Sequence, residues 1–193
     1  MTNFRKCFPA LAQRAACTLL AVAALSPGMA GAVLKTDPAV STVSAVFKQL
    51  NVPVEAKFRK FNAQIDYDAG KPATAKANID IDISSFDLGD PDYNKEVLKK
   101  EWFNAAQFPK ATFVSTAITP GAAGKLTVSG KLTIKGKTAD VSFPLTQKTE
   151  AGRQIFDGVL PIRRLGYGVG EGDWKDTDVV ADEVIIRFHI VAA

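Results

Sequence analysis

The chain has 193 residues, and its 24 Lys and Arg residues against 20 Asp and Glu residues give a formal net charge of +4. Three of the basic residues, Arg5, Lys6 and Arg14, lie in an acid-free stretch at the start, so the remaining chain from residue 33 is almost neutral. A near-neutral surface excludes a nucleic-acid binder, whose electrostatic footprint should be strongly basic.

Residues 1–32 have the pattern of a secretory signal. A basic start is followed by an apolar run, Ala15–Leu25, and then by the small-residue cleavage pattern Ala30-Gly31-Ala32. The apolar run is too short to span a bilayer, which takes about 20 residues. We therefore expect cleavage after Ala32, and a soluble periplasmic or secreted domain formed by residues 33–193.

The predicted mature domain is poor in chemically reactive side chains. Both cysteines, Cys7 and Cys17, lie in the predicted signal, and the single histidine of the chain is His189. This composition excludes disulfides, thiolate metal sites and multi-histidine metal centres in residues 33–193. We expect no catalysis, no cofactor and no metal there, and the strand pattern around His189 places that side chain away from the interior.

Most of residues 33–193 alternate between apolar and polar side chains, the pattern of strands with one dry face and one wet face. The clearest case is Thr74–Ile83, in which isoleucines and alanines alternate with Lys, Asn and Asp. The sequence predicts eight or nine strands: Thr42–Leu50, Val54–Lys60, Ala63–Tyr67, Thr74–Ile83, Ala111–Ile118, Leu126–Ile134, Thr138–Gln147, Gln154–Ile162 and Glu183–Val191.

The alternation breaks once, near the middle of the chain. Asp90-Pro91 is a helix-start signal, because Asp caps the free backbone N–H groups and Pro fits the first helical position. We predict one helix of about ten residues there, followed by an aromatic-rich connection to Pro109. The fold class is therefore all-β, and a single antiparallel barrel of about eight strands or a two-sheet sandwich would both produce this alternation.

Several short motifs occur in the same order as in a known bacterial family. The sequence resembles the YceI-like, lipocalin-like polyisoprenoid-binding proteins over essentially all of residues 33–193. The motifs that carry the resemblance are Ala56-Lys57-Phe58-Arg59-Lys60-Phe61, Ser85-Phe86-Asp87-Leu88-Gly89, Phe108-Pro109-Lys110-Ala111-Thr112-Phe113-Val114-Ser115, Gly130-Lys131-Leu132-Thr133-Ile134-Lys135-Gly136-Lys137-Thr138, Arg164-Leu165-Gly166-Tyr167-Gly168-Val169-Gly170 and Asp182-Glu183-Val184.

The resemblance implies an exported lipocalin-like barrel, monomeric or homodimeric, whose hydrophobic tunnel holds a polyisoprenoid or another long amphiphile for transport, storage or sequestration. Lipophilic antibiotics are a further class of ligand that such a tunnel could accept. The loop Glu171–Asp176 resembles a Trp-containing subgroup associated with cytochrome b561-type membrane proteins. An alternative function is therefore a quinone-binding accessory that docks transiently on such a cytochrome.

We expect the ligand to contact apolar side chains from the inward strand faces and the aromatic connection, although a packed core would use the same residues. Arg163 and Arg164 are candidates for a head-group contact, unless they are solvated or paired with an acid such as Asp182 or Glu183. Because the sequence shows no convergent polar site, binding should tolerate varied head groups. The predicted ligand-binding residues are Phe47, Phe58, Ile79, Ile81, Ile83, Phe86, Leu98, Trp102, Phe103, Phe108, Phe113, Val128, Leu132, Phe143, Phe156, Leu160 and Phe188.

Overall fold

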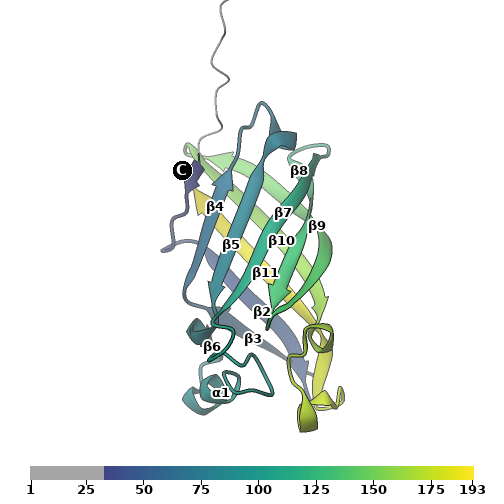
Figure 1. The fold of residues 1–193 in the computed structure, drawn as a ribbon. Helices are drawn as coiled ribbons and strands as arrows, with labels where there is room; N and C mark the ends of the chain where they lie inside the picture. The colour runs from purple at the N-terminus through teal and green to yellow at the C-terminus, as the bar shows by residue number, and fades with distance from the viewer. Residues whose placement is uncertain (1–32) are drawn as a thin grey trace, which may run out of the picture. The chain divides into compact units, whose positions relative to one another are not determined.

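A computed structural model describes residues 33–193, and the predicted signal segment, residues 1–32, lies outside the described residues. No helix within residues 33–193 is long and apolar enough to cross a membrane. The described part contains one α-helix, α1 (Pro91–Glu96), and eleven strands (Figure 1). The strands are β1 (Val33–Lys35), β2 (Thr42–Gln49), β3 (Val52–Phe58), β4 (Phe61–Asp66), β5 (Lys76–Asp82), β6 (Phe86–Asp87), β7 (Lys110–Pro120), β8 (Lys125–Ile134), β9 (Lys137–Glu150), β10 (Arg153–Arg163) and β11 (Val180–Ala192).

All the strands belong to one antiparallel sheet with the order β1-β4-β5-β7-β8-β9-β10-β11-β2-β3-β6. The sheet curls on itself, and the segment at β1 joins β4 to the end of β11 (Figure 1). Lys35 and Ala193 exchange two backbone hydrogen bonds, of 2.7 and 3.0 Å, and the Thr36 hydroxyl donates to the Ala63 carbonyl at 2.7 Å. The all-β lipocalin-like barrel is therefore confirmed, and the two-sheet sandwich is not the fold.

The structure contains more strands than the eight or nine that the alternation predicts. The two additional strands are β1 and β6, which have three and two residues. Alternation cannot be recognised over so few residues, because a period of two needs at least four positions to stand out. Both short strands pair at the margins of the sheet order, so they extend the predicted barrel without changing its class.

The predicted helix begins where expected but is shorter than ten residues. The Asp90 carboxylate accepts hydrogen bonds from the backbone N–H groups of Asp92 and Tyr93, and the helix ends at Glu96. The chain then continues in turns, with Phe103 N–H donating to the Val97 carbonyl at 3.0 Å. These turns pack the aromatic connection against the end of the barrel. This tertiary packing ends the helix earlier than the local helical pattern predicts.

The interior of the barrel is formed from alternate positions of the strands. In β8, Leu126, Val128, Leu132 and Ile134 are buried, and the side chains between them face outward. Because successive side chains of a strand point to opposite faces, the curled sheet collects the apolar half of each strand in one place. The barrel interior is therefore formed by the apolar strand faces that the sequence pattern predicted.

A glycine on the inward face makes room for an aromatic ring. Gly158 in β10 lies directly opposite Phe188 in β11. A methyl group on Gly158 would lie only 2.0 Å from Cζ of Phe188, far inside van der Waals contact. The Phe188 ring therefore occupies space that any larger residue at position 158 would take.

We predict that Gly158→Ala lowers the free energy of unfolding by about 1–3 kcal/mol, because the new methyl group overlaps the Phe188 ring. Gly166→Ala is the matched control, since nothing lies within 4 Å of a methyl group there. Urea unfolding measures both variants. In a Phe188→Ala background the loss caused by Gly158→Ala should shrink, and an unchanged loss would contradict the proposed overlap.

Candidate functional site

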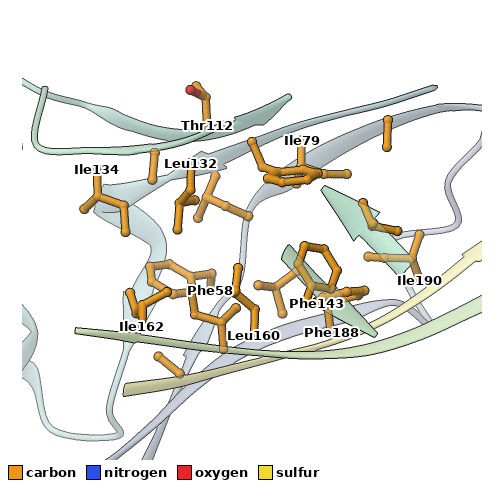
Figure 2. Close-up of a pocket in the computed structure, with 18 of the residues that line it drawn as sticks. Phe58, Ile79, Thr112, Leu132, Ile134, Phe143, Leu160, Ile162, Phe188 and Ile190 are labelled. Atoms are coloured by element: carbon orange, nitrogen blue, oxygen red, sulfur yellow. The ribbon is translucent and has the colours of Figure 1, made fainter. Parts of the chain in front are cut away.

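The curled sheet encloses a cavity of about 190 Å³, which we call the barrel cavity (Figure 2). One water molecule needs only about 10–15 Å³ of such space, so the barrel cavity is too large to be a packing defect. Many of the ligand-binding residues predicted from the sequence line it, and they come from strands around the whole barrel. They are Phe58, Ile79, Ile81, Ile83, Phe103, Phe113, Val128, Leu132, Phe143, Phe156, Leu160 and Phe188.

The sequence analysis missed the small residues that create the space. Ala45, Ala75, Ala77 and Ala111 line the barrel cavity together with the larger side chains. They occupy the same alternating strand positions, so the period of two indicates that they face inward, but their small size gives no sign of contact with a ligand. Arg164, a predicted head-group candidate, also lines the barrel cavity. Other lining residues that were not predicted as ligand contacts are Val43, Ile65, Tyr67, Thr112, Ile118, Leu126, Ile134, Leu145, Ile162, Tyr167, Val169, Val184, Ile186 and Ile190.

Aromatic rings form a connected part of the cavity wall. The ring of Phe143 makes edge-on contacts with Phe113 and Phe188, with centroids 5.6 and 5.5 Å apart. Figure 2 shows Phe143 and Phe188 together on one side of the cavity, opposite Ile79. Such pairs fix ring orientation and contribute about 0.5–1.5 kcal/mol beyond the area that they bury. The wall is therefore a defined surface, not a loose collection of side chains.

The few polar side chains along the barrel cavity contribute little polarity to it. Figure 2 shows the oxygen of Thr112 directed away from the other labelled side chains. Burial raises the pKa of the Tyr167 phenol, and burial together with the nearby Asp68 raises that of Tyr67, so both phenols are neutral near pH 7. Among the described residues that line the cavity, Arg164 is the one with a permanent charge.

Arg164 is only 2% exposed, and its guanidinium is bound by backbone carbonyl groups. Its Nε donates to Ala181, its Nη1 to Val169 and Gly170, and its Nη2 to Trp174 and Val180, at 2.7–3.1 Å. All five N–H groups are thus engaged, and none remains for a ligand head group. Burial lowers the pKa of this arginine, and the field of Asp182 opposes that shift.

Arg163 lies elsewhere, on the outside of the barrel. Its side chain is 80% exposed and pairs with the Asp182 carboxylate at 3.3 Å, the acid pairing that the sequence left open. Arg163 does not line the barrel cavity. The two adjacent arginines therefore have different surroundings, and neither presents a free, inward-facing N–H group.

The aromatic connection after α1 packs against one end of the barrel. The Glu101 carbonyl accepts hydrogen bonds from Gly170 N–H at 2.9 Å and Glu171 N–H at 2.7 Å, which fastens the connection to the loop after β10. The Lys135 ammonium group bridges the same region, donating to Gly168 O at 2.6 Å and pairing with Glu171 at 3.0 Å. This end of the barrel is held by the backbone bonds and by one partly buried ion pair.

A smaller pocket of about 80 Å³, which we call the rim pocket, lies at this end. The predicted residues Phe47, Phe86 and Trp102 line the rim pocket instead of the barrel cavity, whereas Phe103 lines both. The full lining of the rim pocket is Ala45, Phe47, Gln49, Phe86, Leu88, Tyr93, Glu96, Val97, Trp102, Phe103, Arg164, Val169, Trp174, Val180 and Val184.

Two predicted residues line neither space. Leu98 packs against the hydrophobic core, and Phe108 lies against Gly136, where a methyl group would meet its ring at 2.6 Å. His189 lies on the outer face, as its strand position predicts, with its Nδ1 2.6 Å from the Asp157 carboxylate on the neighbouring strand. None of these three side chains contributes to the site.

The fold and the site together define a lipocalin-like antiparallel barrel with an apolar internal cavity. A family model described as the YceI-like domain matches residues 34–192, and the chain belongs to this family. The sequence resemblance to the YceI-like proteins is thereby confirmed.

Solved and curated proteins agree with this assignment. BcnA of Burkholderia cenocepacia is 54% identical, with a TM-score of 0.80 over 82% of this chain and 99% of that chain. A UPF0312 protein of Shewanella putrefaciens is 30% identical over 137 residues, which are 69% of this chain and 70% of the relative. A polyisoprenoid binding domain from Saccharophagus degradans, 19% identical, shares the fold with a TM-score of 0.67 over 83% and 97% of the two chains.

We predict that Leu132→Trp fills the barrel cavity and abolishes binding of long apolar molecules while the melting temperature stays near that of the parent protein. Leu132 lines the cavity, so the larger ring has space to enter. In a filled core the same change would overpack and destabilise by about 1–3 kcal/mol. The outward-facing Thr127→Trp is the control, and strong destabilisation by Leu132→Trp would remove the lining assignment at that position.

Proposed function

We propose that this protein binds a polyisoprenoid, or another long hydrophobic or amphiphilic molecule, inside the barrel cavity. The observation that carries the proposal is the size of this cavity together with its hydrocarbon wall. The Saccharophagus degradans domain with the same fold is described as polyisoprenoid binding, which supports the same class of ligand here. The YceI-like family is a binding-protein fold, and a binding role needs no reactive group in the cavity.

The energetics favour a long chain over a compact polar molecule. Burial of one methylene group is worth about 0.8 kcal/mol, so a five-carbon isoprene unit contributes roughly 3–4 kcal/mol before costs. Four buried units supply about 14 kcal/mol, against roughly 4–15 kcal/mol for association. When association costs about 4–6 kcal/mol, the remaining free energy corresponds to an affinity in the micromolar range or tighter without any specific polar contact.

We further propose that the protein acts outside the cytoplasm. The basic, apolar and small-residue pattern of residues 1–32 supports export and cleavage after Ala32. In the periplasm or the medium, the domain of residues 33–193 would carry, store or sequester its ligand, and lipophilic antibiotics with long or flat apolar parts are further candidates. Detection of Met1 at the N-terminus of the exported protein would contradict the proposed processing.

The loop that carries Trp174 favours a second candidate function. This loop resembles the subgroup linked to cytochrome b561-type membrane proteins, and the side chain of Trp174 lines the rim pocket beside Trp102. In this role the protein would bind a quinone and dock transiently on the cytochrome. A neighbouring gene for such a cytochrome, and binding between the two purified proteins, would distinguish this role from general lipid carriage.

The proposed function predicts that affinity rises with chain length. In a series of prenyl alcohols, each added isoprene unit should tighten binding by about tenfold or more until the barrel cavity is filled. Isothermal titration calorimetry measures the series, and the Leu132→Trp protein is the control in which the rise should disappear. Equal affinity for short and long chains in the parent protein would contradict binding in the barrel cavity.

A further inference from the structure

The ladder of backbone pairs between β9 and β10 stops partway along the barrel. The two strands pair as far as Leu145 and Gly158. Beyond this pair, residues 137–144 of β9 pair with β8, and residues 159–163 of β10 pair with β11. In the part of the chain that the structure describes, no ladder pair joins these two stretches, which together we call the open seam. Side-chain packing, and not a hydrogen-bonded ladder, closes the barrel wall there.

A proline in each strand keeps the open seam unpaired. Pro144 directly precedes Leu145 in β9, and Pro161 follows Gly158 in β10. Proline has no N–H group to donate, so within sheets it occurs where a strand lacks a partner on that side. The two prolines therefore disfavour a longer ladder, and the interruption is specified by the sequence.

The inner side of the open seam faces the barrel cavity. Phe143 of β9 and Leu160 and Ile162 of β10 belong to the seam, and all three line the cavity. Figure 2 shows these side chains along one side of the cavity. Because no ladder crosses the seam, a displacement of these apolar side chains would connect the cavity with the outside without breaking ladder hydrogen bonds.

The outer side of the open seam is also apolar. Pro144, Val159 and Pro161 are exposed there, whereas the outward positions of the neighbouring strand β8 carry Lys, Thr and Ser. Removal of water from polar groups is costly, and removal from apolar groups is favourable. A hydrocarbon chain that crosses the wall at the seam would therefore meet apolar side chains on both faces.

The end of the barrel at the rim pocket is a less favourable entrance. The Glu101 carbonyl accepts hydrogen bonds there from the N–H groups of Gly170 and Glu171, and Lys135 pairs with the Glu171 carboxylate. Opening this end breaks those bonds. Opening the seam separates only apolar side chains, whose lost contacts the incoming chain replaces.

We propose that the open seam is the route by which the apolar chain of the ligand enters and leaves the barrel cavity. The wall parts between Phe143 and Leu160, the chain passes sideways across the exposed prolines, and the side chains close behind it. The inference rests on the proposed function, because it needs an apolar chain in the barrel cavity.

The test closes the open seam with a chemical crosslink. Continuing the ladder register places Asp140 beside Arg163, and both residues are exposed on the outer face. Asp140→Cys and Arg163→Cys are joined by a bismaleimide whose linker dithiothreitol cleaves, in a chain that also carries Cys7→Ser and Cys17→Ser. The probe is a geranylgeranyl ester of N-methylanthranilic acid, whose fluorescence rises in apolar surroundings, and stopped-flow mixing measures its uptake.

The crosslinked protein should take up the probe at least tenfold more slowly than the same protein before crosslinking, and dithiothreitol should restore the rate. The equilibrium affinity should change less than twofold, because the crosslink blocks the path and leaves the cavity lining unchanged. Thr146→Cys with Asp157→Cys is the matched control, since these residues pair directly on the same two strands. Crosslinking the control should change the uptake rate less than twofold.

A second variant needs no reagent. Pro144→Thr with Pro161→Thr restores two N–H donors, so the ladder should extend and uptake should slow severalfold. An extended ladder is detected by hydrogen exchange of the new N–H groups, and uptake at the parent rate in a protein with that ladder would overturn the inference.

The outcomes separate the entrance from the proposed function. An unchanged uptake rate in the crosslinked protein, or equal slowing in the crosslinked control, would overturn the open seam as the entrance while the chain-length series still tests the barrel cavity. A parent protein that took up neither the probe nor any prenyl alcohol would contradict the proposed function itself, and the entrance with it.

Discussion

The alternation of side chains along the strands is the constraint on which the rest of this structure depends. Because one face of a curled sheet is shared by all its strands, the apolar half of each strand meets in a single interior. Alanines such as Ala77 and Ala111 occupy some of these inward positions, and each lies two residues before a larger inward side chain, Ile79 or Phe113. The interior is consequently apolar throughout but only partly filled, and a binding site follows from the same pattern that specifies the fold.

Arg164 organises the end of the barrel at which the rim pocket lies. Its guanidinium joins carbonyl groups from the loop after β10, the turn at Trp174 and the start of β11. Gly170 is needed for this arrangement, since a methyl group there would lie 2.1 Å from Nη1 of Arg164, and its φ of +79° favours glycine. A buried cation with all its donors occupied stabilises the loops without offering a charge site to the ligand.

Period-two alternation predicted the all-β class and part of the cavity wall, and the resemblance to the YceI-like proteins favoured a barrel over a sandwich. The predicted residues Ile81, Phe113, Leu132, Phe143 and Phe188 belong to different strands, and all five line the barrel cavity. Local patterns could not predict the rest. The shortened helix and the separate rim pocket arise from contacts between segments far apart in the chain, which no spacing of residue types encodes.

The different surroundings of Arg163 and Arg164 also could not be predicted from local sequence patterns. The two residues are adjacent in the sequence, yet one is exposed and paired with Asp182 and the other is buried among carbonyl groups. Strand alternation predicts that neighbours face opposite sides, but it does not say which one finds backbone acceptors. That choice depends on the path of the loop after β10, which the tertiary structure sets.

The central claim is that a long apolar molecule occupies the barrel cavity. The most direct measurement is native mass spectrometry of the protein purified from its own host, followed by organic extraction of the bound material. We expect one long-chain hydrophobic molecule per protein, released by the organic solvent, and absent from the Leu132→Trp variant. A parent protein that carried only the mass of its polypeptide, and that took up no prenyl chain when supplied with one, would contradict it.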